Sequence, residues 1–259
     1  MRGWLPFYRT SVALGLGSLA RGRFGREAVV RVVIPLDPSR YLELPWALAA
    51  LDAGPGDRVL DVGSPKLLPL VLARRGALIT SVDELPREIE TWRRLTLGTE
   101  NLELQVGDGR SLPFRDASFD HGTTISVLEH VTEDGDAAVL AELARCVRPG
   151  GRIVVTLPHA ERAWDEYRAR ATYVDHGESG DGHLFQRWYD DDRVDLLVAS
   201  VPAVRERDRS VVRMRPNWNR AYTKAFPWLV ALGPVYGLLG TESRDPRGDV
   251  VRILLERVE

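Results

Sequence analysis

Three aspartates follow short apolar runs at regular intervals, and their carboxylates could bind the polar groups of a nucleoside. Asp61 lies near the end of the run 58–63, Asp83 closes the run 77–83, and Asp108 closes the run 102–108. A carboxylate accepts hydrogen bonds from two ribose hydroxyls or from an exocyclic amine such as that of adenine. One aspartate in such a place is usually a helix cap or a turn former. Three at successive strand ends favour a shared ligand site.

The segments that would position these acids alternate between strand-like and helix-like patterns. Five strands are predicted, at 58–63, 77–83, 102–108, 119–126 and 151–157, and the helices of this region at 67–75, 86–97 and 135–147. This alternation predicts βαβ units and a parallel sheet covered by helices on both faces. Ligands of such sheets bind beyond the carboxyl ends of the strands, where the three acids are expected.

The regions on either side of this pattern have different characters. Residues 1–57 are interpreted as a helical extension with turns, including a short helix at 46–51, and residues 58–259 as one α/β domain. The alternation breaks after Pro158 and resumes with a helix at 190–200. Two further strands are predicted at 211–215 and 250–258, which makes seven strands. The aromatic segment 159–188 and the apolar segment 216–248 are predicted to be lid insertions on the substrate side.

Several segments resemble, in order, the motifs of class I S-adenosylmethionine (SAM) methyltransferases of the ubiquinone/menaquinone type, which are methyltransferase type 11-like. They are 59–63 (VLDVG), 81–83 (SVD), 107–114 (GDGRSLPF) with 118–120 (SFD), 127–131 (VLEHV) and 148–152 (RPGGR). The ordered set is far more specific than any one motif. A nicotinamide-binding protein would show G-x-G-x-x-G at the first turn, where this chain has GSPKLL.

The resemblance implies a Rossmann-like, mostly parallel seven-stranded sheet, SAM as the cofactor, and an enzyme that methylates a small organic acceptor. It also implies the cofactor-binding residues. The methionine end would be lined by Asp61, Gly63 and Ser64, the ribose hydroxyls bound by Asp83, the adenine bordered by Asp108 and Gly109, and the cofactor flanked by Ser126 and Leu128.

The first motif departs from the family pattern D-x-G-x-G-x-G. Pro65 and Leu67 stand where the second and third glycines are usual. Proline removes an N–H donor and fixes φ, so the loop should be stiffer and offer fewer donors to the methionine carboxylate. Lys66 could restore positive charge. An alternative is therefore a methyltransferase-like domain that has lost or repurposed SAM binding, as a scaffold or for other chemistry.

The candidate catalytic residues are histidines and one tyrosine. His130 belongs to the VLEHV segment and can be structural or catalytic. His176, His183 and Tyr173 lie in the aromatic segment 159–188, where such enzymes build substrate contacts. A histidine would serve as general base for an oxygen acceptor. The histidine spacing matches no zinc-binding pattern, and no metal is expected.

Composition limits the partners. The formal net charge is -2, which gives no general attraction to nucleic acid. Cys146 is the only cysteine, so no intrachain disulfide can form, which fits a cytoplasmic protein. The Cys146 thiol is predicted to be buried. The segments 1–40 and 205–224 are rich in arginine, which can attract a protein weakly to a membrane surface. Another alternative is therefore a peripheral-membrane methyltransferase that acts on a lipid-linked substrate. The apolar stretch 225–239 is too short to cross a bilayer. The oligomeric state is left open.

Overall fold

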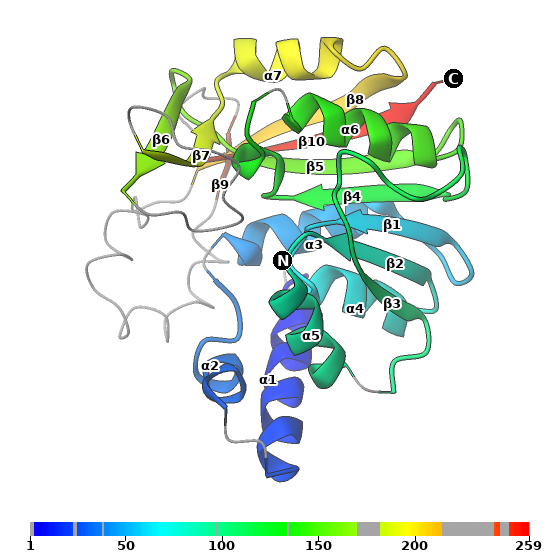
Figure 1. Cartoon of the computed structure of the whole chain (residues 1–259), viewed down its shortest axis with the longest axis vertical. Helices are drawn as coiled ribbons and strands as arrows, with labels where there is room; N and C mark the ends of the chain where they lie inside the picture. The colour runs from blue at the N-terminus through cyan, green and yellow to red at the C-terminus, as the bar shows by residue number, and fades with distance from the viewer. Residues whose placement is uncertain are drawn as a thin grey trace.

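Five apolar segments of the sequence form parallel strands at the centre of the protein. In the computed structural model, which describes residues 3–22, 25–37, 39–96, 98–133, 135–169, 182–213, 241–243 and 249–258, one sheet has the order β3-β2-β1-β4-β5-β10-β8-β9. Its long strands are β1 (Arg58–Val62), β2 (Leu78–Asp83), β3 (Leu102–Val106), β4 (His121–Ile125), β5 (Arg152–Pro158), β8 (Val204–Arg213) and β10 (Val250–Arg257). The predicted mostly parallel, Rossmann-like sheet is confirmed (Figure 1), and seven of its strands in the described residues are the long ones just named.

The last three strands of this sheet run antiparallel to their neighbours. β10 pairs with β5 on one side and β8 on the other, and the short β9 (Thr241–Ser243) adds an eighth strand beside β8. The prediction of a strand at 211–215 was wrong in its bounds, because β8 begins at Val204. The arginines at the start of β8 do not interrupt this strand, because Arg205 and Arg207 pair with Glu256 on the neighbouring strand β10.

Helices cover both faces of the sheet, which explains why β1 and β5 are buried on both sides. α6 (Gly135–Cys146) and α7 (Asp191–Ala199) pack with one apolar core. α4 (Leu67–Arg74) and α5 (Pro86–Leu95) pack with a second core on the opposite face. The strand order reverses between β1 and β4, so the loops that follow these strands separate there and leave room for a ligand.

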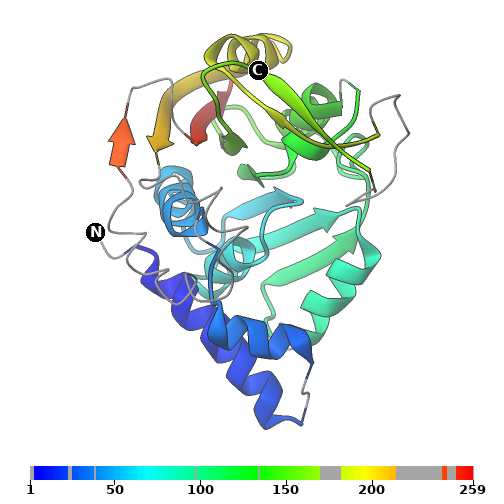
Figure 2. The same ribbon diagram turned by 90° about the vertical axis from the view of Figure 1, so that its left-hand side faces the viewer.

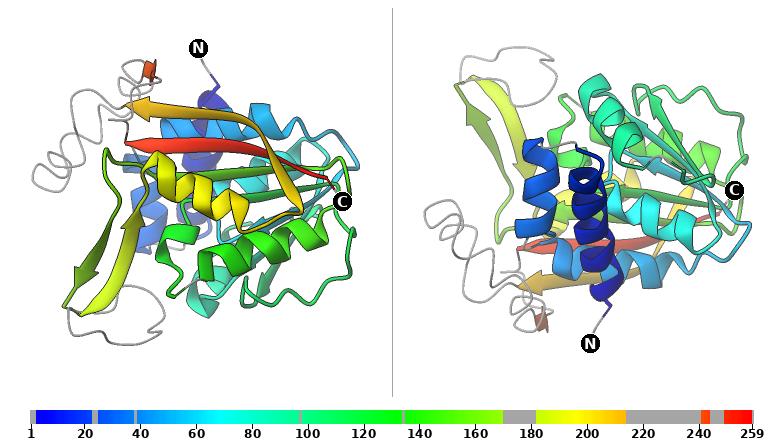
Figure 3. Two further views of the ribbon diagram at one scale, coloured as in Figure 1. Left: turned by 90° about the horizontal axis from the view of Figure 1, so that it is seen from above. Right: turned by 90° about the horizontal axis from the view of Figure 1, so that it is seen from below.

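The N-terminal region forms three helices, α1 (Leu5–Ala20), α2 (Arg26–Val33) and α3 (Arg40–Leu51). α1 and α3 contribute to the second core, and α2 packs against α1. Phe7 of α1 and Leu44 of α3 are fully buried with the side chains of α4. α3 continues through Pro45, beyond the predicted helix 46–51, because the burial of Leu44 and its neighbours outweighs one missing backbone hydrogen bond. Figure 3 shows α1 and α2 side by side on this face.

A two-stranded antiparallel hairpin lies outside the main sheet. Its strands are β6 (Trp164–Arg168) and β7 (His183–Trp188), and the rings of Trp164 and Trp188 stack with centroids 5.6 Å apart. Figure 2 shows the hairpin and helices α1 and α2 at opposite ends of one side of the molecule. The sequence pattern predicts no strands in this segment. No described helix is long and apolar enough to cross a membrane.

Cys146 offers a direct test of the core on the α6 side of the sheet. Its side chain has 0% exposure, as predicted, and burial raises the pKa of its thiol to about 11. Because the thiolate is the reactive form, we expect the folded protein to react with a disulfide reagent at pH 8 at least about 100-fold more slowly than the denatured chain. Absorbance of the released thiol measures both rates. Equal rates would contradict the packing described.

Candidate functional site

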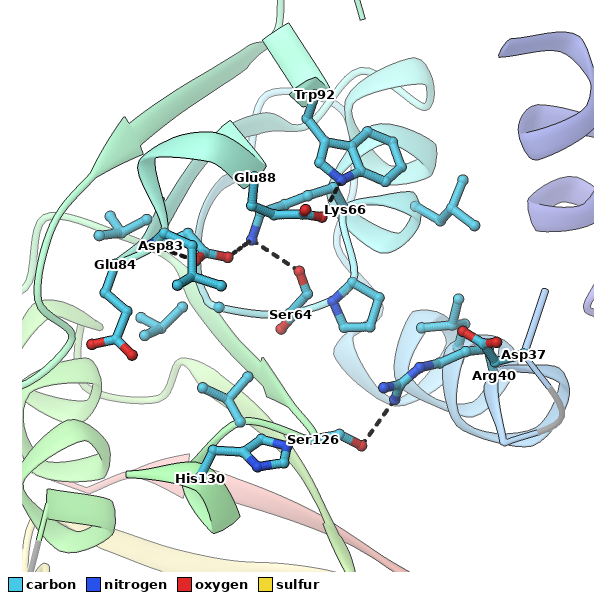
Figure 4. Close-up of a pocket in the computed structure, with 18 of the residues that line it drawn as sticks. Asp37, Arg40, Ser64, Lys66, Asp83, Glu84, Glu88, Trp92, Ser126 and His130 are labelled. Carbon is cyan, nitrogen blue, oxygen red and sulfur yellow. Dashed lines mark hydrogen bonds and ion pairs between the residues drawn. The ribbon is translucent and has the colours of Figure 1, made fainter. Parts of the chain in front are cut away.

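A cavity of about 510 Å³ opens at the carboxyl ends of β1, β2 and β4. Its walls come from the loops after these strands, from α2 and α5, and from the 3-10 turn η1 (Leu128–His130). This is the switch point of the sheet, where the chain order predicts a ligand site. Figure 4 shows the cavity with Lys66 and Asp83 at one side and Ser126 and His130 at another.

A buried ion pair forms part of the cavity wall. Lys66 Nζ donates to Asp83 Oδ2 at 2.8 Å and to the Ser64 carbonyl oxygen at 3.0 Å. The other oxygen of Asp83 accepts from the Leu85 backbone N–H at 3.0 Å. Lys66 is 1% exposed and Asp83 9%. The β1 loop is therefore fixed to the end of β2 by a side chain.

Asp61 lies behind this wall. Its two oxygens accept from Ser81 Oγ at 2.5 Å and from Thr123 Oγ1 at 2.8 Å, which links β1 to both neighbouring strands. Lys66 Nζ is 3.8 Å from Asp61 Oδ2. Asp61 is buried and is absent from the cavity lining. In this arrangement Asp61 supports the loop and does not line the cavity.

Two glycines let the backbone pass close to neighbouring side chains. Gly63 has φ of +67°, and a Cβ there would lie 2.7 Å from a Val127 methyl group. A Cβ on Gly109 would lie 2.8 Å from Val62. Both positions line the cavity. Because neither leaves room for a Cβ, the packing of the cavity wall requires glycine at each of them. Ser64 Oγ, next in the loop, accepts from the Ile125 N–H at 2.9 Å.

The N-terminal extension supplies an arginine to the cavity. Arg40 of α3 donates to Ser126 Oγ at 2.9 Å and pairs with Glu43. Glu43 is buried and also accepts from Ser126 Oγ at 2.9 Å and from Thr156 Oγ1 at 3.1 Å. Sequence reasoning missed Arg40. Its spacing of three residues from Glu43 within an apolar helix was the available signal for a buried pair.

His130 and Glu129 lie together at the end of β4. His130 Nδ1 is 2.5 Å from the Phe185 carbonyl oxygen, which can only accept, so this nitrogen carries the hydrogen. Burial lowers the pKa of His130, which favours the neutral form of its ring. Glu129 Oε1 is 3.7 Å from His130 Nε2, and Oε2 has no hydrogen-bond partner among the described residues. Burial raises the pKa of Glu129 to about 8.

The wall formed by α2 and α5 holds an arginine on a tryptophan. The Arg31 guanidinium carbon lies 4.0 Å from the centroid of the Trp92 ring. Trp92 Nε1 donates to Glu88 Oε1 at 2.7 Å, which fixes the ring. Within the described part of the chain, Arg31 Nε is buried without a hydrogen-bond partner. The contact joins the N-terminal extension to the second helix after the β1 loop.

The structure brings most of the predicted cofactor-binding residues together. The cavity is lined by Gly63, Ser64, Asp83, Asp108, Gly109, Ser126 and His130, whereas Asp61 and Leu128 are buried behind it. Asp108 is 44% exposed and forms a two-point ion pair with Arg110.

The remaining catalytic candidates are not brought together. His183 lies in β7 opposite Arg168 and does not line the cavity. His176 and Tyr173 lie outside the described residues, as does all of 216–248 except β9. Within the residues described, no group of three or more acidic, histidine or cysteine side chains could hold a metal ion.

Comparison with known proteins identifies the central part of the chain. Residues 60–155 match a family model described as a methyltransferase domain. This part of the chain is therefore similar to a methyltransferase domain. The matched segment runs from β1 into β5 and includes η1, and therefore covers the strand ends that form the cavity.

Curated relatives match this part of the chain over part of their own length. The demethylmenaquinone methyltransferase of Mycobacterium sp. (strain KMS) is 39% identical over 108 residues, 41% of this chain and 44% of that protein. The protein of the same name from Mycobacterium marinum is 35% identical over 145 residues, 54% of this chain and 58% of that protein. The chain spans about a third to three fifths of the relatives it matches.

Solved structures share the fold of this chain at low identity. The 1,6-didemethyltoxoflavin-N1-methyltransferase of Burkholderia thailandensis, solved with S-adenosylhomocysteine, has a TM-score of 0.55 and 16% identity, covering 97% of this chain and 88% of that one. The [4+2]-cyclase SpnF also has a TM-score of 0.55 and 16% identity, covering 83% of this chain and 80% of that one.

Proposed function

We propose that this domain binds SAM in the cavity and transfers its methyl group to a small organic acceptor. The observation that carries the proposal is the position of Asp83, at the end of β2 and on the cavity wall between the Gly63 turn and Asp108. A carboxylate at that strand end suits a ribose diol. The bound S-adenosylhomocysteine of the Burkholderia thailandensis enzyme supports the same choice of cofactor.

The charge of the cavity fits SAM. Its described lining includes three cationic side chains, Arg31, Arg40 and Lys66, and six carboxylates, Glu27, Asp37, Asp83, Glu84, Glu88 and Asp108. The carboxylates outnumber these cations, so the lining has an excess of negative charge. SAM carries a sulfonium and an ammonium cation against one carboxylate, so a negative wall is favourable to it. The cavity volume also lies in the usual range for a small-molecule site.

Each residue of the cavity would have a role set by its position. When bound, SAM supplies the methyl group on a sulfonium sulfur. Asp83 would accept hydrogen bonds from the ribose, and Arg40, beside Ser126, would attract the methionine carboxylate. With Nδ1 donating to Phe185, the Nε2 atom of His130 is the basic nitrogen that would take the acceptor's proton. The enclosing helices would exclude water and align the acceptor with the methyl group.

A second candidate is a domain of this fold that no longer methylates. Pro65 stiffens the loop and Lys66 already pairs with Asp83, which together reduce the groups offered to SAM. The likeness to a cyclase of the same fold supports this alternative. For either function we propose a small-molecule ligand, a cytoplasmic location and no nucleic-acid partner. The alternative of weak membrane contact depends on 216–248, which lies outside the described residues except at β9.

Calorimetric titration with SAM and with S-adenosylhomocysteine separates the two candidates. We expect both compounds to bind the purified chain with one site per molecule, and we expect adenosine to compete with them. A thermal-shift series with the same compounds checks that the heat reports binding to the folded protein. No heat and no thermal shift at millimolar SAM would favour the domain that has lost the cofactor.

A further inference from the structure

Lys66 is the residue that most distinguishes this cavity. It lies in the loop between two positions where the family pattern has glycine, and its side chain is almost wholly buried while still reaching the cavity lining. A buried ammonium group is costly unless carboxylates and hydrogen bonds compensate it. Asp83 Oδ2 lies 2.8 Å from Lys66 Nζ, and Asp61 Oδ2 lies 3.8 Å from it. One ammonium group therefore lies beside the carboxylates at the ends of two neighbouring strands.

The hydrogen bonds of this pair leave capacity for a ligand. An ammonium group has three N–H donors, and Lys66 uses two of them, on Asp83 Oδ2 and on the Ser64 carbonyl. For the third N–H donor, the nearest remaining acceptor among the described residues is Asp61 Oδ2, and its distance of 3.8 Å from Nζ is too long for a hydrogen bond. Asp83 accepts one hydrogen bond at each oxygen, from Lys66 and from Leu85, and a carboxylate can accept about four.

A hydroxyl group both donates and accepts, and the two residues together match both functions. Asp83 alone can only accept, whereas the pair can accept a hydroxyl hydrogen and donate to a hydroxyl oxygen. We propose that Lys66 is a ribose-binding residue of this chain, which fixes the Asp83 carboxylate and donates to a hydroxyl oxygen of the bound nucleoside. This inference rests on the proposed function, because the nucleoside in question is that of SAM.

The consequence is strong selection for an intact ribose. Removing one hydroxyl from the ligand would leave a buried charged donor or acceptor without its partner, which weakens binding by about tenfold or more. A lysine that only holds the loop in shape would instead affect ligands with and without that hydroxyl to the same extent. The two roles therefore differ in ligand preference and not only in affinity.

The first experiment measures that preference by calorimetry. The ligands are S-adenosylhomocysteine and its 2′-deoxy and 3′-deoxy analogues, and the proteins are the wild type, Lys66→Met and Lys66→Gln. We expect the wild type to prefer the intact ligand about tenfold over at least one analogue. Lys66→Met should reduce that preference to about threefold or less, and Lys66→Gln, which keeps an N–H donor, should lie between. An unchanged preference in Lys66→Met would overturn the proposal.

The second experiment needs no substitution at the site. The chain has only two lysines, Lys66 and Lys224, so Lys224→Arg leaves Lys66 as the sole lysine. In protein carrying ¹³C-labelled lysine, the NMR signal of Lys66 Cε should shift as S-adenosylhomocysteine is added. The ligand concentration at half of the full shift should agree with the affinity measured by calorimetry. A signal that does not move while the ligand binds would overturn the Lys66 proposal and leave the proposed function standing.

The same labelled protein separates failure of the inference from failure of the function. If adenosine moves the Lys66 signal but neither SAM nor S-adenosylhomocysteine binds, Lys66 is a nucleoside-binding residue and the proposed cofactor is wrong. If none of the three binds, both proposals are wrong. The test remains decisive even if Lys66→Met does not fold, because the labelled protein keeps Lys66.

Discussion

Asp83→Ala is expected to weaken SAM binding by at least about tenfold. A hydrogen bond to a charged group contributes on the order of 1.5–3 kcal/mol, and the ribose would lose its carboxylate acceptor. Isothermal titration of wild type and variant measures the change. The substitution also removes the nearest partner of buried Lys66, so Asp83→Asn, which keeps the shape and one acceptor oxygen, should be compared by thermal unfolding.

The matched control for Asp83 is an exposed aspartate away from the cavity. Asp52 lies after α3, its side chain is 74% exposed, and it pairs with Arg152. Asp52→Ala should leave SAM affinity unchanged. If Asp83→Asn folds like the wild type and both Asp83 variants bind SAM normally, the ribose does not lie against β2 and the proposed position of the cofactor is wrong.

Glu129→Gln is expected to stabilise the protein at alkaline pH. Burial raises the pKa of this carboxyl from 4.5 to about 8, so the folded protein holds its proton more tightly than the unfolded chain does. The stabilisation from the protonated carboxyl is complete below pH 4.5 and is lost as the pH rises through about 8. Glutamine is neutral throughout, so the variant should equal the wild type near pH 4.5 and exceed it at pH 8.5.

Thermal unfolding of both proteins between pH 4.5 and pH 8.5 measures this difference. We expect a gain of at least about 1 kcal/mol at pH 8.5, which corresponds to a rise of about 2–4 °C in Tm. The control is Glu103→Gln, which changes an exposed glutamate of β3. A constant difference between Glu129→Gln and wild type across this pH range would show that folding does not raise the pKa of Glu129.

The sequence predicted the parts of the site that follow from strand order. Asp83 and Asp108 come at or just after the ends of adjacent parallel strands, and Gly63 comes at the end of a third, so the sheet alone brings them to one edge. Periodicity and turn residues are enough to place such positions. The same reasoning placed Asp61 at this edge but could not show that Ser81 and Thr123 bind both of its oxygens.

The parts that the sequence did not predict depend on contacts between distant segments. Arg40 reaches Ser126 only because α3 packs across the sheet, and no local pattern gives that packing direction. The β6–β7 hairpin buries little apolar surface, so its residues lack the clear alternation that marks a strand. The start of β8 was missed because its charges are neutralised by partners on other strands and helices, such as Glu256 and Asp195.

The contact between Arg31 and Trp92 has a consequence for how fast a ligand can leave. α2 and α5 both contribute to the cavity wall, and the contact between the Arg31 guanidinium and the Trp92 ring joins these two helices. If a ligand leaves between these helices, they must separate, which breaks the stacking and exposes both groups to water. The residence time of the ligand would then be set by the opening of an N-terminal helix rather than by the contacts at the strand ends.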